Sequence, residues 1–514
     1  MAATTGPGAY ANRFDRAYGN TFAERERDWR NGAVVYQVLV DRFAPSLNLE
    51  AKRHLYPAPK TLKPWTAQAV RGTYREDLGL WSHEIDFWGG DLASLRSKLG
   101  YVQGLGTDVL YLNPIHLGYT NHKYDSLDFN VVSPEFGSRD DLRALIKESH
   151  SRGMKVVLDG VFNHMGQHAE IFKQAKRDPS SPYRDWFNFS PKFEGGARTW
   201  YDAQNLPELN LENPKVREHI YAGRDSVVRS YLRDGADGWR LDVAYDIGFN
   251  YLEELRRAAH EEKPGSLVVG EVANYPKEWF PSLDGVMNFT LTEIIISTAK
   301  GLLPAATSTR MVERMVADVG IENMLKSWVL LDNHDTDRIA TTIPQPNLRR
   351  LAQILQFTLP GAPNLYYGSE IDMTGGEDPA MRSPMAWDQV RDDHPSIVWT
   401  KQLIKLRKDH RALRIGDFRP ITSTSLMAFE RHTDRVEDTI LVFVNPSDKA
   451  VTETVMHGNS KLMDGRLLVD VIGKTAPVEP RAAMPRITLP PYSFLVLKPV
   501  VTPVKGYTGY KRVQ

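Results

Sequence analysis

The sequence predicts an α/β protein whose centre is a (β/α)8 TIM barrel. Short apolar runs alternate eight times with longer amphipathic stretches, which is the pattern of parallel strands connected by helices. The runs are rich in β-branched residues and show little strict alternation, as expected for strands buried on both faces. The predicted strands cover 34–43, 108–114, 155–162, 238–244, 266–272, 285–289, 328–335 and 364–368.

The stretches between these runs carry helix signals. Within 140–153 the apolar residues share one face, Ser138 is a candidate N-cap, and Gly153 ends the pattern. An early Pro and a terminal Gly bracket a second stretch, so one helix is predicted over 213–235. A third helix is predicted over 401–413.

Three segments fall outside the barrel pattern. Residues 1–33 are polar and contain glycine, so we expect an N-terminal arm before the barrel at 34–414. A long interval rich in aromatic and polar residues follows the third strand and predicts an inserted domain, domain B, at 165–213. From 415 to 514, short strands alternate with turn residues and predict an antiparallel β-sandwich. Its clearest strands are 426–432, 438–445 and 493–499.

The bulk composition excludes several classes of function. The 514 residues include 64 Lys and Arg and 64 Asp and Glu, so the net charge is zero and we expect neither nucleic acid nor membrane as a partner. The chain has no cysteine, which excludes disulfides, thiolate metal sites and a Cys nucleophile. We recognise no signal peptide and no apolar run of membrane-spanning length, so we expect a cytoplasmic protein.

Charged and imidazole side chains gather at the C-terminal ends of four predicted strands. These ends form one rim in a barrel, and the rim carries the active site. Because burying an unpaired charge is costly, such residues need one another or a substrate. One Asp at a strand end is usually a turn or a cap, but four such ends together indicate a catalytic site. The residues are Asp159, His164, Arg240, Asp242, Glu271, His334 and Asp335.

The acids at this rim fit glycoside hydrolysis. That reaction needs one carboxylate that attacks or activates water and one carboxylic acid that protonates the leaving oxygen. Asp242 and Glu271 come from neighbouring strands, about 5 Å apart, near the ~5–5.5 Å separation of retaining enzymes. Arg240 lies on the same side of its strand as Asp242 and is expected to lower the pKa of that carboxyl. Asp335 would be a third acid that grips sugar hydroxyls.

The segments around these residues resemble the signatures of the α-amylase superfamily, glycoside hydrolase family 13. The four segments occur in the family's order: DGVFNH (159–164), GWRLDVAYD (238–246), GEVAN (270–274) and LLDNHD (330–335). The resemblance implies that Asp242 is the nucleophile, Glu271 the acid/base and Asp335 the transition-state stabiliser. It also implies an oligosaccharide substrate and a −1 sugar site. We expect the substrate-binding residues to be His122, Tyr124, His164, Arg240, His334 and Arg338.

Within the family, LPELN (206–210) and VMNF (286–289) resemble the neopullulanase, cyclomaltodextrinase and maltogenic amylase group. Enzymes of this group act on small or cyclic α-1,4 glucans and tolerate α-1,6 links. The chain departs from the group at Tyr245-Asp246 and at Ala273-Asn274, which border the +1 and +2 subsites. Because only about 33 residues precede the first predicted strand, the dimer built by the group's N-terminal domain is in doubt, and either a monomer or a homodimer is expected.

The resemblance leaves several functions open. The first hypothesis is a retaining hydrolase of maltooligosaccharides, cyclodextrins or mixed α-1,4/α-1,6 oligosaccharides, including a branched cyclic glucan. The alternatives are a transglycosylase on the same covalent intermediate, a sugar isomerase, and a non-catalytic relative, which the three acids disfavour. No obligatory cofactor or calcium ion is expected, because the calcium loop is not recognisable after the first strand and Tyr245-Asp246 replaces the Lys-His of secreted α-amylases.

Overall fold

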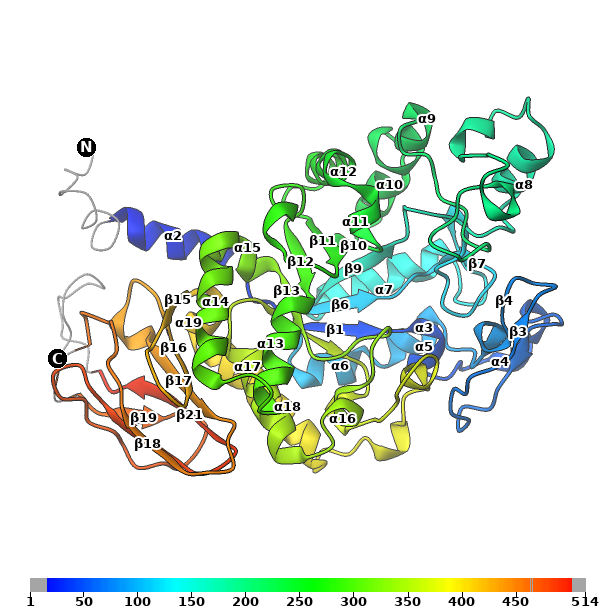
Figure 1. The fold of residues 1–514 in the computed structure, drawn as a ribbon. Helices are drawn as coiled ribbons and strands as arrows, with labels where there is room; N and C mark the ends of the chain where they lie inside the picture. The colour runs from blue at the N-terminus through cyan, green and yellow to red at the C-terminus, as the bar shows by residue number, and fades with distance from the viewer. Residues whose placement is uncertain (1–15, 463, 465, 502–514) are drawn as a thin grey trace.

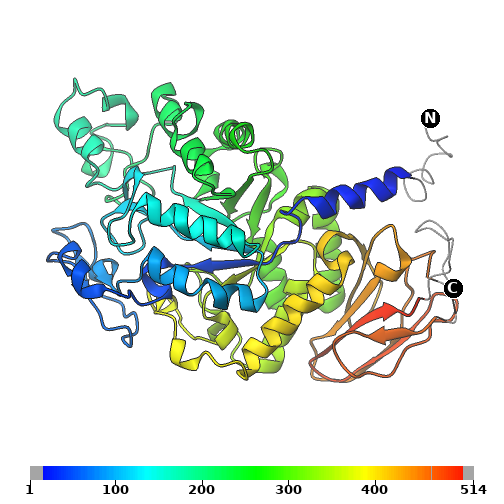
Figure 2. The same cartoon turned by 180° about the vertical axis from the view of Figure 1, so that it is seen from behind.

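The structure is a computed structural model that describes residues 16–462, 464 and 466–501. A barrel of strands occupies the centre of the molecule, and a C-terminal β-domain packs at one end of it (Figure 1). Helix α8 (Glu170–Arg177) and strands β3 (Tyr74–Arg75) and β4 (Leu80–Trp81) lie at the opposite end. The view from behind shows the same order (Figure 2).

Eight parallel strands close the barrel, as the sequence predicts, in the order β1-β14-β13-β12-β11-β10-β9-β6. Each predicted run overlaps one strand, although β14 begins two residues before the predicted start at 364. Nearly all strand residues are buried, which explains the weak alternation of the runs. The strands are β1 (Val35–Val38), β6 (Val109–Leu112), β9 (Lys155–Gly160), β10 (Gly238–Leu241), β11 (Leu267–Val272), β12 (Gly285–Asn288), β13 (Trp328–Leu330) and β14 (Ala362–Tyr366).

The interior of the barrel is filled by side chains from alternate strand positions. Tyr111 and Trp328 are its largest residues, with ring centroids 5.0 Å apart. Smaller residues such as Val35, Val157 and Val269 complete this cluster. Because the interior is packed, it has no room for a ligand, and in barrels of this kind functional sites lie at the C-terminal ends of the strands.

Helices surround the barrel and connect its strands. Helix α7 starts as predicted, since the Ser138 side chain accepts a hydrogen bond from the Asp141 N–H at 3.1 Å. The main covering helices are α5 (Leu92–Ser97), α6 (Leu99–Leu105), α7 (Arg139–Ser151), α10 (Val227–Arg233), α12 (Phe249–Glu262), α13 (Phe289–Ala299), α14 (Ala305–Val319), α17 (Pro346–Thr358) and α18 (Pro395–Asp409).

Two helices predicted as continuous are divided. The prediction over 213–235 was wrong because α9 (Pro214–Arg217) passes into a π-helical turn that ends at Gly223. Gly223 adopts an extended backbone, and a Cβ there would lie 2.6 Å from the Glu218 carbonyl oxygen. The prediction over 401–413 was wrong because α18 ends at Asp409 and α19 (Arg411–Ile415) begins after His410.

The C-terminal β-domain contains two antiparallel sheets that enclose one apolar cluster, as predicted for this region. Leu441, Phe443 and Leu495 from the larger sheet pack with Ile487 and Leu489 from the smaller. The larger sheet has the order β15 (Asp417–Pro420), β16 (Met427–His432), β17 (Ile440–Asn445), β21 (Ser493–Pro499) and β19 (Leu468–Asp470), and the smaller pairs β18 (Val451–Thr454) with β20 (Arg486–Leu489).

The predicted N-terminal arm contains helix α2 (Arg16–Arg27), and residues 1–15 of the arm lie outside the described residues. Arg25 ties this helix to both main parts of the molecule. Its guanidinium pairs with Glu322 at 2.6 Å and with Asp417 of the C-terminal β-domain at 2.8 Å.

Two segments stand above the C-terminal rim of the barrel. Domain B follows β9, as predicted, and is held by isolated bridges such as His164–Glu208 and Phe187–Leu209. The second segment, residues 44–91 after β1, was not predicted as a distinct structure. It contains the β3–β4 hairpin and its own cluster of Tyr56, Leu80, Ile85 and Phe87.

Candidate active site

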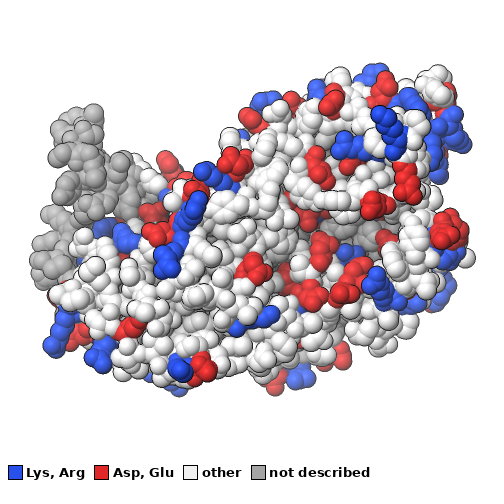
Figure 3. Space-filling view, in the orientation of Figure 1, with Lys and Arg blue, Asp and Glu red and all other residues white. Residues whose placement is uncertain are grey.

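A cavity of about 600 Å³ opens at the rim, between domain B and the segment after β1. The face drawn in Figure 3 is hollowed between the lobe that carries α8 and the lobe that carries β3 and β4, and Asp and Glu side chains gather there. The predicted residues that line the cavity are His122, Tyr124, His164, Asp242, Glu271 and Asp335. Residues from five parts of the sequence thus meet in one site.

Arg240 is the centre of charge beneath this cavity. Its strand register places it beside Asp159 of β9, and its Nη1 lies 2.9 Å from Asp159 Oδ1 and 2.9 Å from Asp242 Oδ1. Its Nη2 forms an ion pair with Glu271 Oε2 at 3.0 Å. Arg240 is fully buried, so one desolvated cation serves three carboxylates.

Two opposing effects act on the pKa of Asp242. Burial raises the pKa of Asp242 well above its usual range, and the nearby carboxylates of Glu271 and Asp159 add to this. Arg240 lowers the pKa of Asp242, as expected, but its charge is divided among three acids and does not outweigh burial.

The backbone after Asp242 is strained. Val243 has φ 39°, a left-handed conformation that is costly for a β-branched residue. This conformation directs the Val243 N–H to Glu271 Oε2 at 2.9 Å. The turn after β10 therefore holds Glu271 in place as well as presenting Asp242.

Tyr124 and His334 form a hydrogen-bonded pair beside the cavity. Their rings stack with centroids 5.3 Å apart and planes 3° apart. Gln37 Nε2 donates to His334 Nδ1 at 2.9 Å, so His334 Nε2 carries the hydrogen and faces the Tyr124 hydroxyl at 2.5 Å. The Tyr124 hydroxyl donates to Asp159 Oδ2 at 2.9 Å. Burial lowers the pKa of His334 and keeps the ring neutral.

Asp335 reaches the cavity from the loop after β13. Its Oδ1 accepts a hydrogen bond from Arg382 Nη2 at 3.1 Å, and its Oδ2 lies 3.1 Å from His334 Nε2. Arg382 also pairs with Asp378 at 3.2 Å. Asp335 is 40% exposed, so it keeps a face free for a ligand.

Two further histidines flank Tyr124. His164 Nε2 bonds to the Tyr124 carbonyl at 3.1 Å and lies 4.0 Å from Asp242 Oδ2. Burial lowers the pKa of His164 to about 4, so this ring is neutral near pH 7. His122 Nε2 lies 3.0 Å from Glu84 Oε1.

Three of the predicted substrate ligands lie outside the cavity lining. Arg240 and His334 are fully buried beneath the residues that line the cavity. Arg338 is also buried, and it donates to the carbonyl oxygens of Met381 at 3.0 Å and Tyr367 at 2.7 Å. The structure therefore places Arg338 as a brace between two loops and not with the residues that face a substrate.

Several lining residues were missed in the sequence. Tyr74, Trp81 and Glu84 come from the segment after β1, and Trp200 comes from domain B. The aromatic residues around Gly79 were a usable signal, since GTYREDLGLW reads as a hairpin with exposed rings. Nothing in the sequence placed that hairpin above the barrel.

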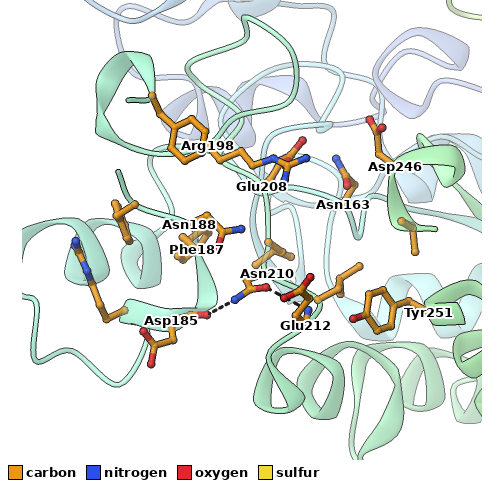
Figure 4. Close-up of a pocket in the computed structure, with 16 residues that line it drawn as sticks. Asn163, Asp185, Phe187, Asn188, Arg198, Glu208, Asn210, Glu212, Asp246 and Tyr251 are labelled. Atoms are coloured by element: carbon orange, nitrogen blue, oxygen red, sulfur yellow. Dashed lines mark hydrogen bonds and ion pairs between the residues drawn. The ribbon is translucent and has the colours of Figure 1, made fainter. Parts of the chain in front are cut away.

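A second cavity, of about 710 Å³, lies between domain B and helices α11 (Ala244–Ile247) and α12 (Figure 4). It shares no lining residue with the first cavity. Arg198 pairs with Glu208 at 2.5 Å in this cavity, and its charge also acts on Asp246. These carboxylates are thus partly neutralised by an arginine. Within the described part of the chain, no cluster of three or more His, Asp or Glu residues is arranged to hold a metal ion.

No helix among the described residues combines the length and apolar character needed to cross a membrane.

Comparison with known proteins identifies the two main parts of the chain. Residues 10–414 match the catalytic domain of alpha amylase, and residues 418–496 match the C-terminal domain of maltogenic amylase. Neopullulanase 2 of Thermoactinomyces vulgaris is 31% identical over 91% of this chain and 78% of its own length. A cyclomaltodextrinase of a Bacillus species is 32% identical over 82% of this chain and 74% of its own.

Solved structures give the same result. The cyclic α-maltosyl-(1→6)-maltose hydrolase of Arthrobacter globiformis, in complex with cyclic α-maltosyl-(1→6)-maltose, superposes with a TM-score of 0.76. It is 26% identical and covers 91% of this chain and 99% of its own. The chain therefore belongs to the α-amylase family of glycoside hydrolases, in the group of neopullulanases, cyclomaltodextrinases and maltogenic amylases.

Proposed function

We propose that this enzyme is a retaining hydrolase of small or cyclic α-glucans that cleaves α-1,4 and also α-1,6 bonds. The observation that carries the proposal is the joint contact of Asp242 and Glu271 with one guanidinium, that of Arg240, on the cavity floor. Two carboxyl groups held this close can serve as nucleophile and acid/base on one sugar.

The reaction proceeds in two displacements. The Asp242 carboxylate attacks the anomeric carbon while Glu271 donates its proton to the glycosidic oxygen, so the carbon–oxygen bond breaks and the leaving sugar departs. Glu271, now ionised, takes a proton from water, whose oxygen attacks the same carbon and releases Asp242. The product keeps the configuration of the substrate, and Glu271 regains its proton.

The neighbouring residues prepare this chemistry. Asp242 must be ionised to attack, and the guanidinium of Arg240, 2.9 Å from its carboxyl, favours that form. Asp335, His122 and His164 offer hydrogen-bonding groups to sugar hydroxyls, and the Tyr124 ring offers an apolar face to the sugar C–H groups. His334 and Arg240 position these residues from below.

The substrate class is supported by the size of the cavity and by the relatives. A volume of about 600 Å³ is in the range of ~300–1,000 Å³ that encloses a small ligand, so a short oligosaccharide fits better than a polymer. The names of the similar enzymes refer to cyclomaltodextrins, pullulan-type glucans and a cyclic maltosyl-maltose.

The test is product analysis with matched variants. Maltotriose, β-cyclodextrin, pullulan and an α-1,6-linked oligosaccharide are each incubated with the wild-type enzyme, with Asp242→Asn and with Glu271→Gln. We expect shorter sugars from the wild type, and a loss of kcat of at least about a thousandfold in each variant. Asp448→Asn, which changes an exposed carboxyl of the C-terminal β-domain, is the control and keeps full activity.

Two results would contradict the proposal. Near-normal activity of Asp242→Asn or Glu271→Gln would exclude the assigned mechanism. Products longer than the substrate, formed in preference to shorter ones, would instead identify a transglycosylase that uses a sugar as acceptor in place of water.

A further inference from the structure

The β3–β4 hairpin forms one end wall of the catalytic cavity. Tyr74, Gly79 and Trp81 from this hairpin line the cavity. The tip of the hairpin reaches the root of domain B, where Gln167 Nε2 donates to the Leu78 carbonyl oxygen at 2.8 Å. Two segments that are far apart in the sequence thus meet above the rim.

The contact at the tip is close. Gly79 has φ 67°, and a Cβ at this position would lie 3.1 Å from Gln167 Nε2. A glycine therefore permits both the turn and the approach of the Gln167 side chain. The hairpin and domain B leave little room between them at this point.

The base of the hairpin is anchored by buried polar contacts. Glu84 Oε1 lies 3.0 Å from His122 Nε2, and its Oε2 accepts a hydrogen bond from the Trp81 N–H. His83 Nε2 lies 3.0 Å from Asp378 Oδ2. Leu80 is buried in the apolar cluster of this segment. These contacts make the hairpin a fixed wall and not a loose loop.

The position of the anchors indicates which end of the cavity the wall closes. The leaving sugar lies on the side of Glu271, which protonates its oxygen. The hairpin is anchored instead at His122 and at Asp378, whose partner Arg382 holds Asp335. Among the described residues, no hydrogen bond or ion pair joins residues 72–82 to Glu271 or Tyr245.

We propose that the β3–β4 hairpin, latched to Gln167, closes the non-reducing end of the substrate cavity and limits how many sugars lie before the cleaved bond. This inference rests on the proposed hydrolysis of α-glucans. Linear chains are then cut from their non-reducing end, with release of a product of one fixed length, and rings are accepted only when they are small enough to fit the cavity. The interior of a long chain is excluded.

The test compares two substrates that differ only at the non-reducing end. One is 4-nitrophenyl α-maltoheptaoside, and the other is the same compound with a 4,6-O-ethylidene group on its terminal sugar. The wild type is expected to hydrolyse the blocked compound at least about tenfold less efficiently, measured as kcat/KM. From the compound without the ethylidene group, the early product that lacks the 4-nitrophenyl group is expected to be an oligosaccharide of a single length.

Two variants open the wall. Replacement of residues 75–79 by two glycines is expected to raise the blocked-to-free ratio of kcat/KM about tenfold, and Gln167→Ala is expected to raise it severalfold. Gln167→Ala keeps the test valid if the shortened hairpin does not fold, which circular dichroism reports. Gln389→Ala, at an exposed glutamine outside the cavity, is the matched control and leaves the ratio unchanged.

The outcomes separate this inference from the proposed function. Equal hydrolysis of both compounds by the wild type would overturn the end-wall proposal. The proposal would also fail if the wild type has a low blocked-to-free ratio of kcat/KM and neither the shortened hairpin nor Gln167→Ala raises it. Loss of hydrolysis of both compounds, or hydrolysis that persists in Asp242→Asn, would contradict the proposed function itself.

Discussion

The side chains around Arg240 show how burial can outweigh a favourable charge pair. Three carboxylates compete for one guanidinium, and the pKa of Asp242 is raised although Arg240 lies 2.9 Å from it. An ionised Asp242 is therefore costly in the folded enzyme. Catalytic residues are commonly held in such unfavourable states because the reaction requires them.

Asp242→Asn is expected to stabilise the fold while it abolishes activity. Because the folded pKa of Asp242 is raised, the cost of ionising this carboxyl is absent below about pH 4, where Asp is protonated in both states. The cost grows as pH rises and is complete above the folded pKa. Urea unfolding at pH 8 should give a free energy of unfolding larger by about 1 kcal/mol in the variant.

The same comparison at about pH 4 should show almost no difference between the two proteins. The exposed-site variant Asp448→Asn should match the wild type at both values. A less stable Asp242→Asn protein at pH 8 would mean that Arg240 controls the ionisation of Asp242 after all.

Single elements of the barrel are held in register by side chains at their ends. Asp237, directly before β10, accepts hydrogen bonds from the Val156 N–H at 2.9 Å and from Lys263 Nζ at 2.9 Å, and lies 2.6 Å from His150 Nε2. One carboxylate thus connects β9, β10 and the ends of α7 and α12. Such a residue determines where the strands start, and hence which residues reach the rim.

Asp237→Asn is expected to destabilise the protein by about 2–3 kcal/mol at pH 7. Burial raises the pKa of Asp237, but the bonds from His150, Lys263 and the Val156 N–H outweigh it and lower the pKa to about 2. The stabilisation by Asp237 is therefore present above about pH 4 and is lost as pH falls towards about 2. Thermal unfolding of variant and wild type across this range measures the effect.

Asp225→Asn is the matched control for this variant, because Asp225 pairs with Arg233 on the surface and is 87% exposed. Its removal should change the free energy of unfolding by less than about 0.5 kcal/mol. If Asp237→Asn has an equally small effect, the buried carboxylate does not hold the strands.

The molecule as a whole depends on buried arginines that join its parts. Arg431 of β16 donates to the carbonyl oxygens of Thr358 at 2.8 Å and Gly416 at 2.8 Å, so the C-terminal β-domain is bonded to the end of α17. Arg407 of α18 similarly bonds the carbonyls of Gly32 at 3.0 Å and Phe357 at 2.8 Å. Burial lowers the pKa of Arg431 to about 9, which shows how strongly the site is desolvated.

Arg431→Met is expected to lower stability by about 3–4 kcal/mol, because it leaves several buried carbonyl oxygens without donors. Activity at 25 °C should be retained, since the C-terminal β-domain lies at the opposite end of the molecule from the β3–β4 wall (Figure 1). Thermal unfolding and kcat are the two measurements. Arg435→Met, at an exposed arginine of the same domain, is the control and should leave stability and kcat unchanged. If Arg431→Met loses only a little stability, the domains pack without this residue.

Much of the fold and of the rim could be predicted from local sequence. All eight barrel strands, the N-cap of α7 and the main strands of the C-terminal β-domain follow from patterns within a few residues. Asp242, Glu271 and Asp335 could be placed in one site because parallel strands of a closed barrel end on one rim. Here a local pattern and a general topological rule were sufficient.

The remaining features depend on contacts between distant segments. The wall made by residues 72–82 exists only because Gln167 meets Leu78, and the helix break at Gly223 depends on the backbone of the preceding turn. The placement of Arg338 behind the cavity and the raised pKa of Asp242 follow from burial, which is a property of the packed molecule. The sequence by itself therefore determined which chemical groups reach the rim, because strand periodicity is local. The tertiary structure decided the shape of the cavity and the burial that raises the pKa of Asp242, because enclosure and desolvation require every surrounding segment to be in place.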